Sequence, residues 1–294
     1  MNIQIALRLG RVSNLPTVWT NVLAGLTLAS VSAGTSASSA QIWALMISMT
    51  FFYLGGMYLN DAFDAEIDAA ERPERPIPSG QVSARLIFHL GFGMLLLGIA
   101  GLAWAGTQLP NGTGWGPAIA GLALAACITF YNWNHKNNPL SPLVMGACRM
   151  LIYVAAGLVL TTSLPNGLYF GAGVLLCYLI GLTFAAKQEN LNQITNLWPL
   201  IFLGIPFAYA AGMLEIDQTS LVILAVFLLW VLYALSFLVF PSRINVPRAV
   251  VSLLAGICLL DALLIAASGE TNLALFALVG FPLTLAFQRW IPGT

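Results

Sequence analysis

Long apolar runs dominate this sequence and limit the folds that are open to it. Ten of them have about the length, roughly 20 residues, that an α-helix needs to cross a lipid bilayer. They are continuous and do not alternate with polar residues, which indicates helices rather than a transmembrane β-barrel. Only 7% of the residues are charged, whereas about a quarter are charged in a soluble domain. The runs occupy residues 14–33, 41–60, 84–106, 116–133, 142–162, 166–186, 196–214, 218–240, 248–267 and 271–290.

The sequence therefore predicts an all-α polytopic membrane protein, and its charges predict how it is oriented. Arginine and lysine occupy alternate connections only. Because cytoplasmic loops are rich in these residues, we expect both termini in the cytoplasm, in a bacterial inner (plasma) membrane. The formal net charge is zero, and we expect no nucleic-acid partner. The loop and terminal cations are Arg8, Arg11, Arg72, Arg75, Arg85, Lys136, Lys187, Arg243, Arg248 and Arg289.

A group of acidic residues stands at the end of the second run. Asn60, Asp61, Asp64 and Asp68 fall within roughly one 100° sector of a helix. Three carboxylates so close together repel one another, and burying them without partners costs several kcal/mol each. Mg²⁺ removes that cost because it binds carboxylate oxygens and keeps positions for substrate phosphates. The alternative is a solvated, acidic helix end.

The same stretch resembles a known family. The pattern Asn60-Asp61-x-x-Asp64-x-x-x-Asp68, followed by Arg-Pro-Ile-Pro-Ser-Gly at residues 75–80, is similar to the first signature of the UbiA-type intramembrane prenyltransferases. The resemblance implies that residues 1–294 form one integral-membrane domain, a helix bundle with a central cavity open to the cytoplasmic side. It also implies that bound Mg²⁺ assists the departure of diphosphate from a prenyl diphosphate, after which an aromatic or other lipophilic acceptor captures the allylic cation. The family core has nine spans, so either the tenth is an addition or two late segments form one broken unit.

The second acidic motif of that family is missing. Where the family has two Asp residues four apart, this chain has a single carboxylate, Glu189, and a nearby cation, Lys187. Lys187 either contacts the diphosphate directly, replacing part of a second metal site, or forms a solvated pair with Glu189. Two-metal catalysis is therefore not expected.

Further polar residues extend the predicted site. Tyr131 and Lys136 resemble a Tyr and Lys pair that lies near the diphosphate in the family, although the spacing here is five and not four. Arg149 falls inside a span, where a charge needs a partner; we expect Asp64, Asp68, Glu189 or a bound diphosphate in that role. Asn14 opens the first run and either contacts the substrate or bonds a neighbouring helix.

Two function classes remain from the sequence. The first is a Mg²⁺-dependent prenyltransferase that uses a prenyl diphosphate and a lipophilic, aromatic acceptor in contact with membrane lipid. The second is a non-catalytic relative that binds or moves a lipid or aromatic metabolite; the EboC-type branch, a divergent UbiA-like group, is a family precedent for a membrane protein of unsettled activity. We predict Asp64, Asp68, Lys187 and Glu189 as catalytic residues, Asn60, Asp61, Asp64 and Asp68 as metal ligands, and as substrate-binding residues Asn60, Arg75, Tyr131, Lys136, Arg149 and Asn14.

Overall fold

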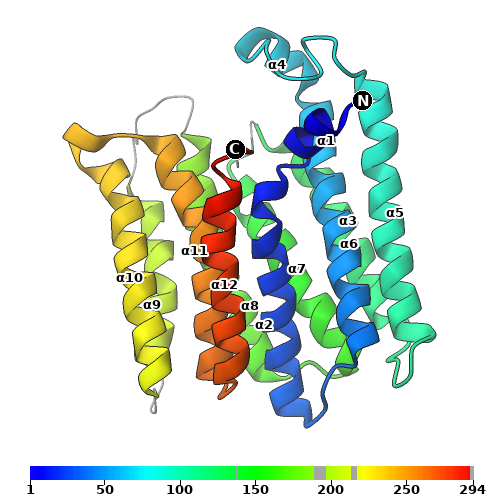
Figure 1. Ribbon diagram of the computed structural model, residues 1–294, viewed down its shortest axis with the longest axis vertical. Coiled ribbons are helices and arrows are strands. Elements are labelled where there is room, and N and C mark those ends of the chain that lie inside the picture. Colours follow the sequence, from blue (N-terminus) through cyan, green and yellow to red (C-terminus); the bar gives the residue numbers. More distant parts are fainter. Residues whose placement is uncertain (137, 189–196, 213–216, 292–294) are drawn as a thin grey trace.

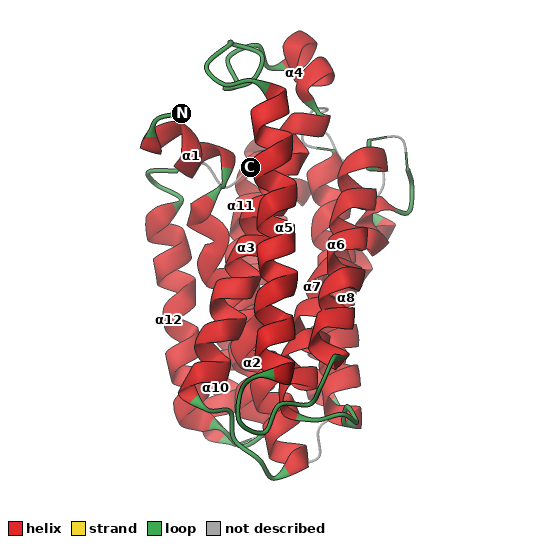
Figure 2. Ribbon diagram, turned by 90° about the vertical axis from the view of Figure 1, so that its right-hand side faces the viewer, coloured by secondary structure: helices red, strands yellow, loops and turns green. Residues whose placement is uncertain are grey.

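The computed structural model describes residues 1–136, 138–188, 197–212 and 217–291, and their regular structure is entirely helical. Figures 1 and 2 show long helices running side by side as one bundle. Each of the ten predicted apolar segments coincides with a helical element. These are α2 (Leu15–Ala33), α3 (Ser39–Phe63), α5 (Ala84–Thr107), α6 (Gly116–Asn134), α7 (Ser141–Leu160), α8 (Asn166–Lys187), η3 (Trp198–Gly204) continuing into α9 (Ile205–Ala211), α10 (Gln218–Val239), α11 (Val246–Ala267) and α12 (Thr271–Phe287).

Seven of the described helices are long and apolar enough to cross a membrane: α3, α5, α6, α7, α8, α10 and α11. The seventh apolar segment is short, Trp198–Ala211, and begins as a 3₁₀-helix before it becomes α-helical. Two short helices, α1 (Ile3–Leu9) and α4 (Ala65–Glu71), lie at one end of the bundle. The N-terminus and the C-terminal end of α12 lie at that same end (Figure 1).

Small residues set the distances between the helices that carry the site. A Cβ added at Gly55 on α3 would lie 2.8 Å from the carbonyl oxygen of Gly91 on α5, so these two backbones are in contact. On α2, a Cβ at Gly25 would lie 2.8 Å from the Cα of Tyr153 on α7. Glycine permits such close packing between membrane helices, where packing and polar contacts replace the hydrophobic effect.

The apolar interior divides into two large clusters. One joins α2 and α7 to α3, α5 and α6, and includes Phe52 and Leu102. The other joins α2 and α7 to α8, α10, α11 and α12, and includes Tyr178 and Phe227. Helices α2 and α7 therefore contribute to both clusters, and the polar residues described next lie where the two halves meet.

Candidate active site at the charged end of the bundle

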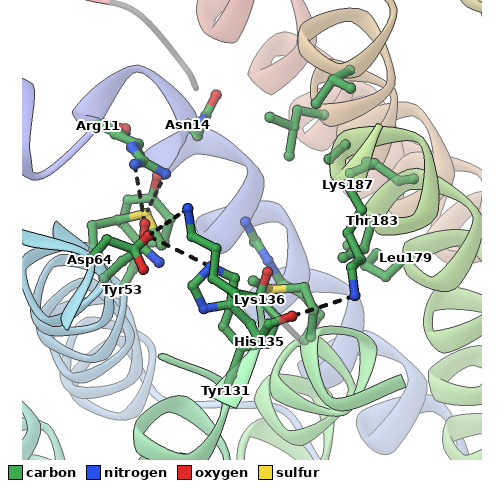
Figure 3. A pocket seen from close by; sticks show the side chains of 18 of the residues that line it. Arg11, Asn14, Tyr53, Asp64, Tyr131, His135, Lys136, Leu179, Thr183 and Lys187 are labelled. Atoms are coloured by element: carbon green, nitrogen blue, oxygen red, sulfur yellow. Dashed lines mark hydrogen bonds and ion pairs between the residues drawn. The ribbon is translucent and has the colours of Figure 1, made fainter. Parts of the chain in front are cut away.

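A cavity of about 290 Å³ is lined by residues of the 3₁₀-turn η1 (Val12–Asn14) and of α3, α4, α6, α7, α8 and α11. Figure 3 shows polar side chains from several of these helices pointing into it. Most of the residues predicted from the sequence meet here, although they come from segments far apart in the chain. Those that line the cavity are Asn14, Asn60, Asp64, Asp68, Arg75, Tyr131, Lys136, Arg149 and Lys187.

Asp64 is the carboxylate at the mouth of this cavity. It follows the last residue of α3 and is only 5% exposed. His135 Nε2 lies 3.6 Å and Lys136 Nζ 3.9 Å from its Oδ2 atom (Figure 3). Among the described residues no hydrogen-bond donor reaches this carboxylate. Burial raises the pKa of Asp64, against the opposing effect of His135 and Lys136. Burial likewise lowers the pKa of His135.

Asp68 lies one turn further on, in α4, and has a direct partner. Its Oδ2 atom is 2.7 Å from Arg75 Nη1, and the residue is 2% exposed. The chain stays helical in its hydrogen bonding between the two acids, because the Asp68 amide donates to the Asp64 carbonyl. Asn60, Asp64 and Asp68 therefore follow one another at four-residue intervals along the cavity wall.

Asp61 does not line the cavity. It sits about 100° around the helix from Asn60 and is bound by Arg11 Nη2 at 3.1 Å, with Arg75 Nη1 at 3.5 Å. The 100° sector predicted from the sequence therefore included one residue, Asp61, that faces the N-terminal segment and not the cavity. Arg11 also bonds Asn60 Oδ1 at 3.2 Å and adopts a left-handed backbone with φ of 40°. We did not predict a role for Arg11; its place immediately before the first span, on the side of the acids, was the available signal.

Several amides and rings hold the wall in place. The Asn60 amide donates to Asn132 Oδ1 at 3.2 Å, and Asn132 donates to the Gly56 carbonyl at 3.0 Å. Tyr131 stacks on His135 with ring centroids 5.0 Å apart. Asn14 Oδ1 accepts from Gln288 Nε2 at 3.0 Å, so both alternatives for Asn14 stay open: it lines the cavity and also bonds a neighbouring helix.

Lys187 enters the cavity wall at the end of α8, but its ammonium group is engaged. It donates to the Asn138 carbonyl at 2.7 Å, to Ser141 Oγ at 2.9 Å and to the His135 carbonyl at 3.4 Å. Lys187 therefore holds the turn between α6 and α7. The other predicted residue of this region, Glu189, lies outside the described residues. Thr183, one turn earlier on α8, lines the cavity with a buried hydroxyl that has no hydrogen-bond partner within the described chain.

Arg149 has different partners from those predicted. Its Nη1 atom donates to Asn21 Oδ1 at 2.9 Å and its Nη2 atom to Thr17 Oγ1 at 3.1 Å, and the guanidinium lies 5.8 Å from the Tyr53 ring centroid. Tyr53 precedes Asp64 by eleven residues, which is about 16 Å along a helix. The expected pairing with Asp64 or Asp68 is therefore wrong, because Arg149 lies too deep in the bundle.

The residues of the mouth fit a hard divalent cation. No group of three or more His, Cys, Asp or Glu side chains suited to a metal occurs within the described ranges. However, Mg²⁺ is usually bound by one or two carboxylates together with substrate phosphates. Asp64 and Asp68 offer those carboxylates. The Asp64 carboxylate, buried without a hydrogen-bond donor, is the group that such a cation would satisfy.

This fold and site define a polytopic membrane protein with an ionic cavity at one end of an apolar bundle. Residues 18–192 match the UbiA prenyltransferase family. The chain belongs to that family. Digeranylgeranylglyceryl phosphate synthase of Methanopyrus kandleri is 38% identical over 92 residues, which is 31% of each chain. The enzyme of the same name from Ignicoccus hospitalis is 40% identical over 101 residues, 33% of this chain and 30% of that one. These matches thus span about a third of the length of either relative.

Solved structures agree with the fold. A UbiA homologue from Archaeoglobus fulgidus bound to GPP and Mg²⁺ superposes with a TM-score of 0.61, 16% identity, and coverage of 91% of this chain and 99% of that one. A structure of digeranylgeranylglyceryl phosphate synthase gives 0.58, also at 16% identity, and covers 92% and 99% of the two chains. At this identity the likeness establishes the shared helical bundle.

Proposed function

We propose that this protein transfers a prenyl group from a prenyl diphosphate to a lipophilic acceptor within the membrane, with Mg²⁺ at Asp64 and Asp68. The observation that carries the proposal is the mouth of the cavity. There Asp64, a buried carboxylate that no donor of the described residues reaches, stands beside His135 and Lys136, and Arg75 binds the neighbouring Asp68. Anionic and cationic groups side by side suit a metal diphosphate, in which the metal meets the acids and the phosphate oxygens meet the cations. Membership of a prenyltransferase family supports the same reading.

Each side chain at the mouth then has a distinct task. Asp64 and Asp68, with the Asn60 amide oxygen, would hold Mg²⁺, which supplies charge neutralisation to the leaving diphosphate. Arg75 and Lys136 contact phosphate oxygens and orient the diphosphate. Lys187 holds the turn that carries His135 and Lys136 against Asp64, and so acts on the diphosphate through these residues.

The apolar part of the substrates has its own space. A smaller cavity of about 80 Å³ adjoins the first and shares Tyr53, Tyr131 and Arg149 with it; its remaining wall is mainly apolar, with Phe52 and Leu124. Tyr53 and Tyr131 present aromatic faces, which attract a cation within about 6 Å. An allylic cation formed at the mouth would therefore be shielded from water and stabilised. We assign this space to the prenyl chain and to the lipophilic acceptor, which we expect to be aromatic.

A second candidate function follows from the second half of the bundle. Ala185 and Gln193 stand four residues to either side of Glu189, so the sequence offers no second pair of acids there. A protein that binds or moves a lipophilic metabolite without turnover needs only the cavity. For either function we propose that the mouth faces the cytoplasm, since the loop cations are on that side of the alternating spans.

A turnover assay separates the two candidates. Purified protein is incubated with labelled prenyl diphosphates of several chain lengths, with Mg²⁺ or with EDTA, and with a panel of aromatic and glycerol phosphate acceptors. We expect a prenylated product only with Mg²⁺, and its loss in Asp64→Asn. Glu66→Gln, which removes an exposed acid from α4, serves as the matched control and keeps activity. Substrate binding without product across the panel would favour the non-catalytic function.

A further inference from the structure

A buried carboxylate lies deep in the bundle, outside the site at the mouth. Asp261, in α11, is 0% exposed. Its oxygens accept hydrogen bonds from Thr20 Oγ1 at 2.5 Å and Tyr153 Oη at 2.5 Å, and from Asn21 Nδ2 at 2.8 and 3.0 Å. All these partners act as donors. This is the environment of an ionised carboxylate, which only accepts hydrogen bonds.

Asn21 connects this carboxylate to Arg149. The amide nitrogen of Asn21 faces Asp261, and its oxygen accepts from Arg149 Nη1 at 2.9 Å. Its two ends cannot be exchanged, because a carboxylate cannot donate and a guanidinium cannot accept. The amide dipole therefore points its positive end at the anion and its negative end at the cation. Arg149 and Asp261 form an ion pair with one side-chain amide between them.

The inserted amide leaves part of the guanidinium free. An arginine side chain has five N–H groups in a planar fork, and the described contacts of Arg149 use one on Nη1 and one on Nη2. Arg149 lines both the ionic cavity and the adjoining apolar one. A direct, bidentate bridge to Asp261 would occupy the edge of the fork. With Asn21 as a spacer, the charge is balanced while N–H groups stay turned toward the cavity.

We propose that Asp261 is a positioning residue: acting through Asn21, it keeps the Arg149 guanidinium oriented so that its unengaged N–H groups bind an oxyanion of a substrate in the cavity. The identification of that ligand as a substrate rests on the proposed function, whereas the coupling of the three residues does not. The oxyanion belongs either to the diphosphate of the donor or to an anionic acceptor. Both would present oxygens to the same fork.

The structure offers variants that separate positioning from support of the fold. Asp261→Asn removes the charge, and Asn21→Ala removes the connection while leaving Asp261 in place. Tyr153→Phe and Thr20→Val are matched controls. Each removes one donor to the same carboxylate, and the side-chain hydrogen bonds of Arg149 go to Asn21 and Thr17, not to either control residue.

The test is equilibrium binding to purified protein in detergent, with inorganic diphosphate plus Mg²⁺ as one probe and benzoate as the other, alongside thermal unfolding. For one of the two probes, we expect Asp261→Asn and Asn21→Ala to weaken binding about tenfold or more, as for loss of a charge-assisted hydrogen bond. Arg149→Gln should do the same, and adding either change to it should weaken binding no further. The probe that is affected identifies the source of the oxyanion.

The controls should lower the unfolding temperature and leave both affinities unchanged. Equal losses of affinity in the controls, additive losses in the double variants, or unchanged binding of both probes would overturn the proposal. If Asp261→Asn does not fold, Asn21→Ala decides the question alone. Because the readout is binding, absence of turnover in the parent would refute the proposed reaction and leave this coupling to be judged separately.

Discussion

Replacing both acids at the mouth by amides should abolish the tightening of diphosphate binding by Mg²⁺. In Asp64→Asn with Asp68→Asn, Arg75 and Lys136 lose the carboxylates that stand 2.7 Å and 3.9 Å away. Without metal, the parent presents these acids to an incoming anion and repels it. The double variant presents mainly cations. We therefore expect it to bind inorganic diphosphate more tightly than the parent in EDTA, and to show no tightening by Mg²⁺.

The magnitude follows from the distances. Two unit charges about 4 Å apart interact by about 4 kcal/mol at an effective dielectric constant of about 20. The Lys136 side chain is 35% exposed, so solvent screening reduces the net gain to about 1–1.5 kcal/mol. That corresponds to roughly tenfold tighter binding in EDTA.

Isothermal titration with inorganic diphosphate, in EDTA and in Mg²⁺, measures both effects. The control is Glu66→Gln, which removes an acid from an exposed position of α4 and should behave as the parent. A merely damaged fold would bind diphosphate more weakly under both conditions. The reasoning is refuted if Mg²⁺ still tightens binding in the double variant, or if binding in EDTA weakens.

Three further outcomes test the structure. Lys187→Gln should loosen the turn between α6 and α7 and so raise the rate of amide hydrogen exchange in that turn. It should also weaken diphosphate binding by up to about tenfold. Weaker binding with unchanged exchange in the turn would instead show that Lys187 contacts diphosphate directly. Gly55→Ala should lower the free energy of unfolding by about 1–3 kcal/mol, because its Cβ would meet the Gly91 carbonyl. Gly93→Ala, whose Cβ meets nothing within 4 Å, should not, and equal effects in thermal denaturation would contradict the close contact. Reporter fusions should place the mouth in the cytoplasm, and an inverted pattern at two or more sites would refute that orientation: outside at Gly34, Gly112 and Gly269, inside at Gly80 and Asn245.

The fold was predictable because its main constraint is local. A run of about 20 apolar residues must form a helix in lipid, where backbone groups have no other partners, and each predicted run is helical in the structure. The four-residue spacing of Asn60, Asp64 and Asp68 likewise places them on one wall, since helical periodicity is a property of the segment alone.

Contacts between distant segments were not predictable in the same way. Arg149 was expected to meet Asp64, Asp68, Glu189 or a bound diphosphate, because a charge within a span needs a partner. Its partners are Thr17 and Asn21. Both are neutral, so charge complementarity could not identify them in the sequence. The ammonium of Lys187 bonds backbone carbonyls, which every residue possesses and no sequence pattern marks. Asp61 differs from its neighbours only by the side of α3 on which Arg11 happens to pack.

The separation of Arg149 from Asp261 along the chain has a consequence for biogenesis. Asp261, in α11, is synthesised 112 residues after Arg149, in α7 (261 − 149). At about 5–20 residues per second, the arginine waits on the order of ten seconds before its counter-ion exists. During that time Thr17 and Asn21, on a helix made earlier, are the partners available to it. Thr17 and Asn21 of α2 thus provide hydrogen-bond acceptors for Arg149 in the nascent chain before Asp261 is made. Replacing these two residues should first slow or prevent the insertion of α7 during synthesis.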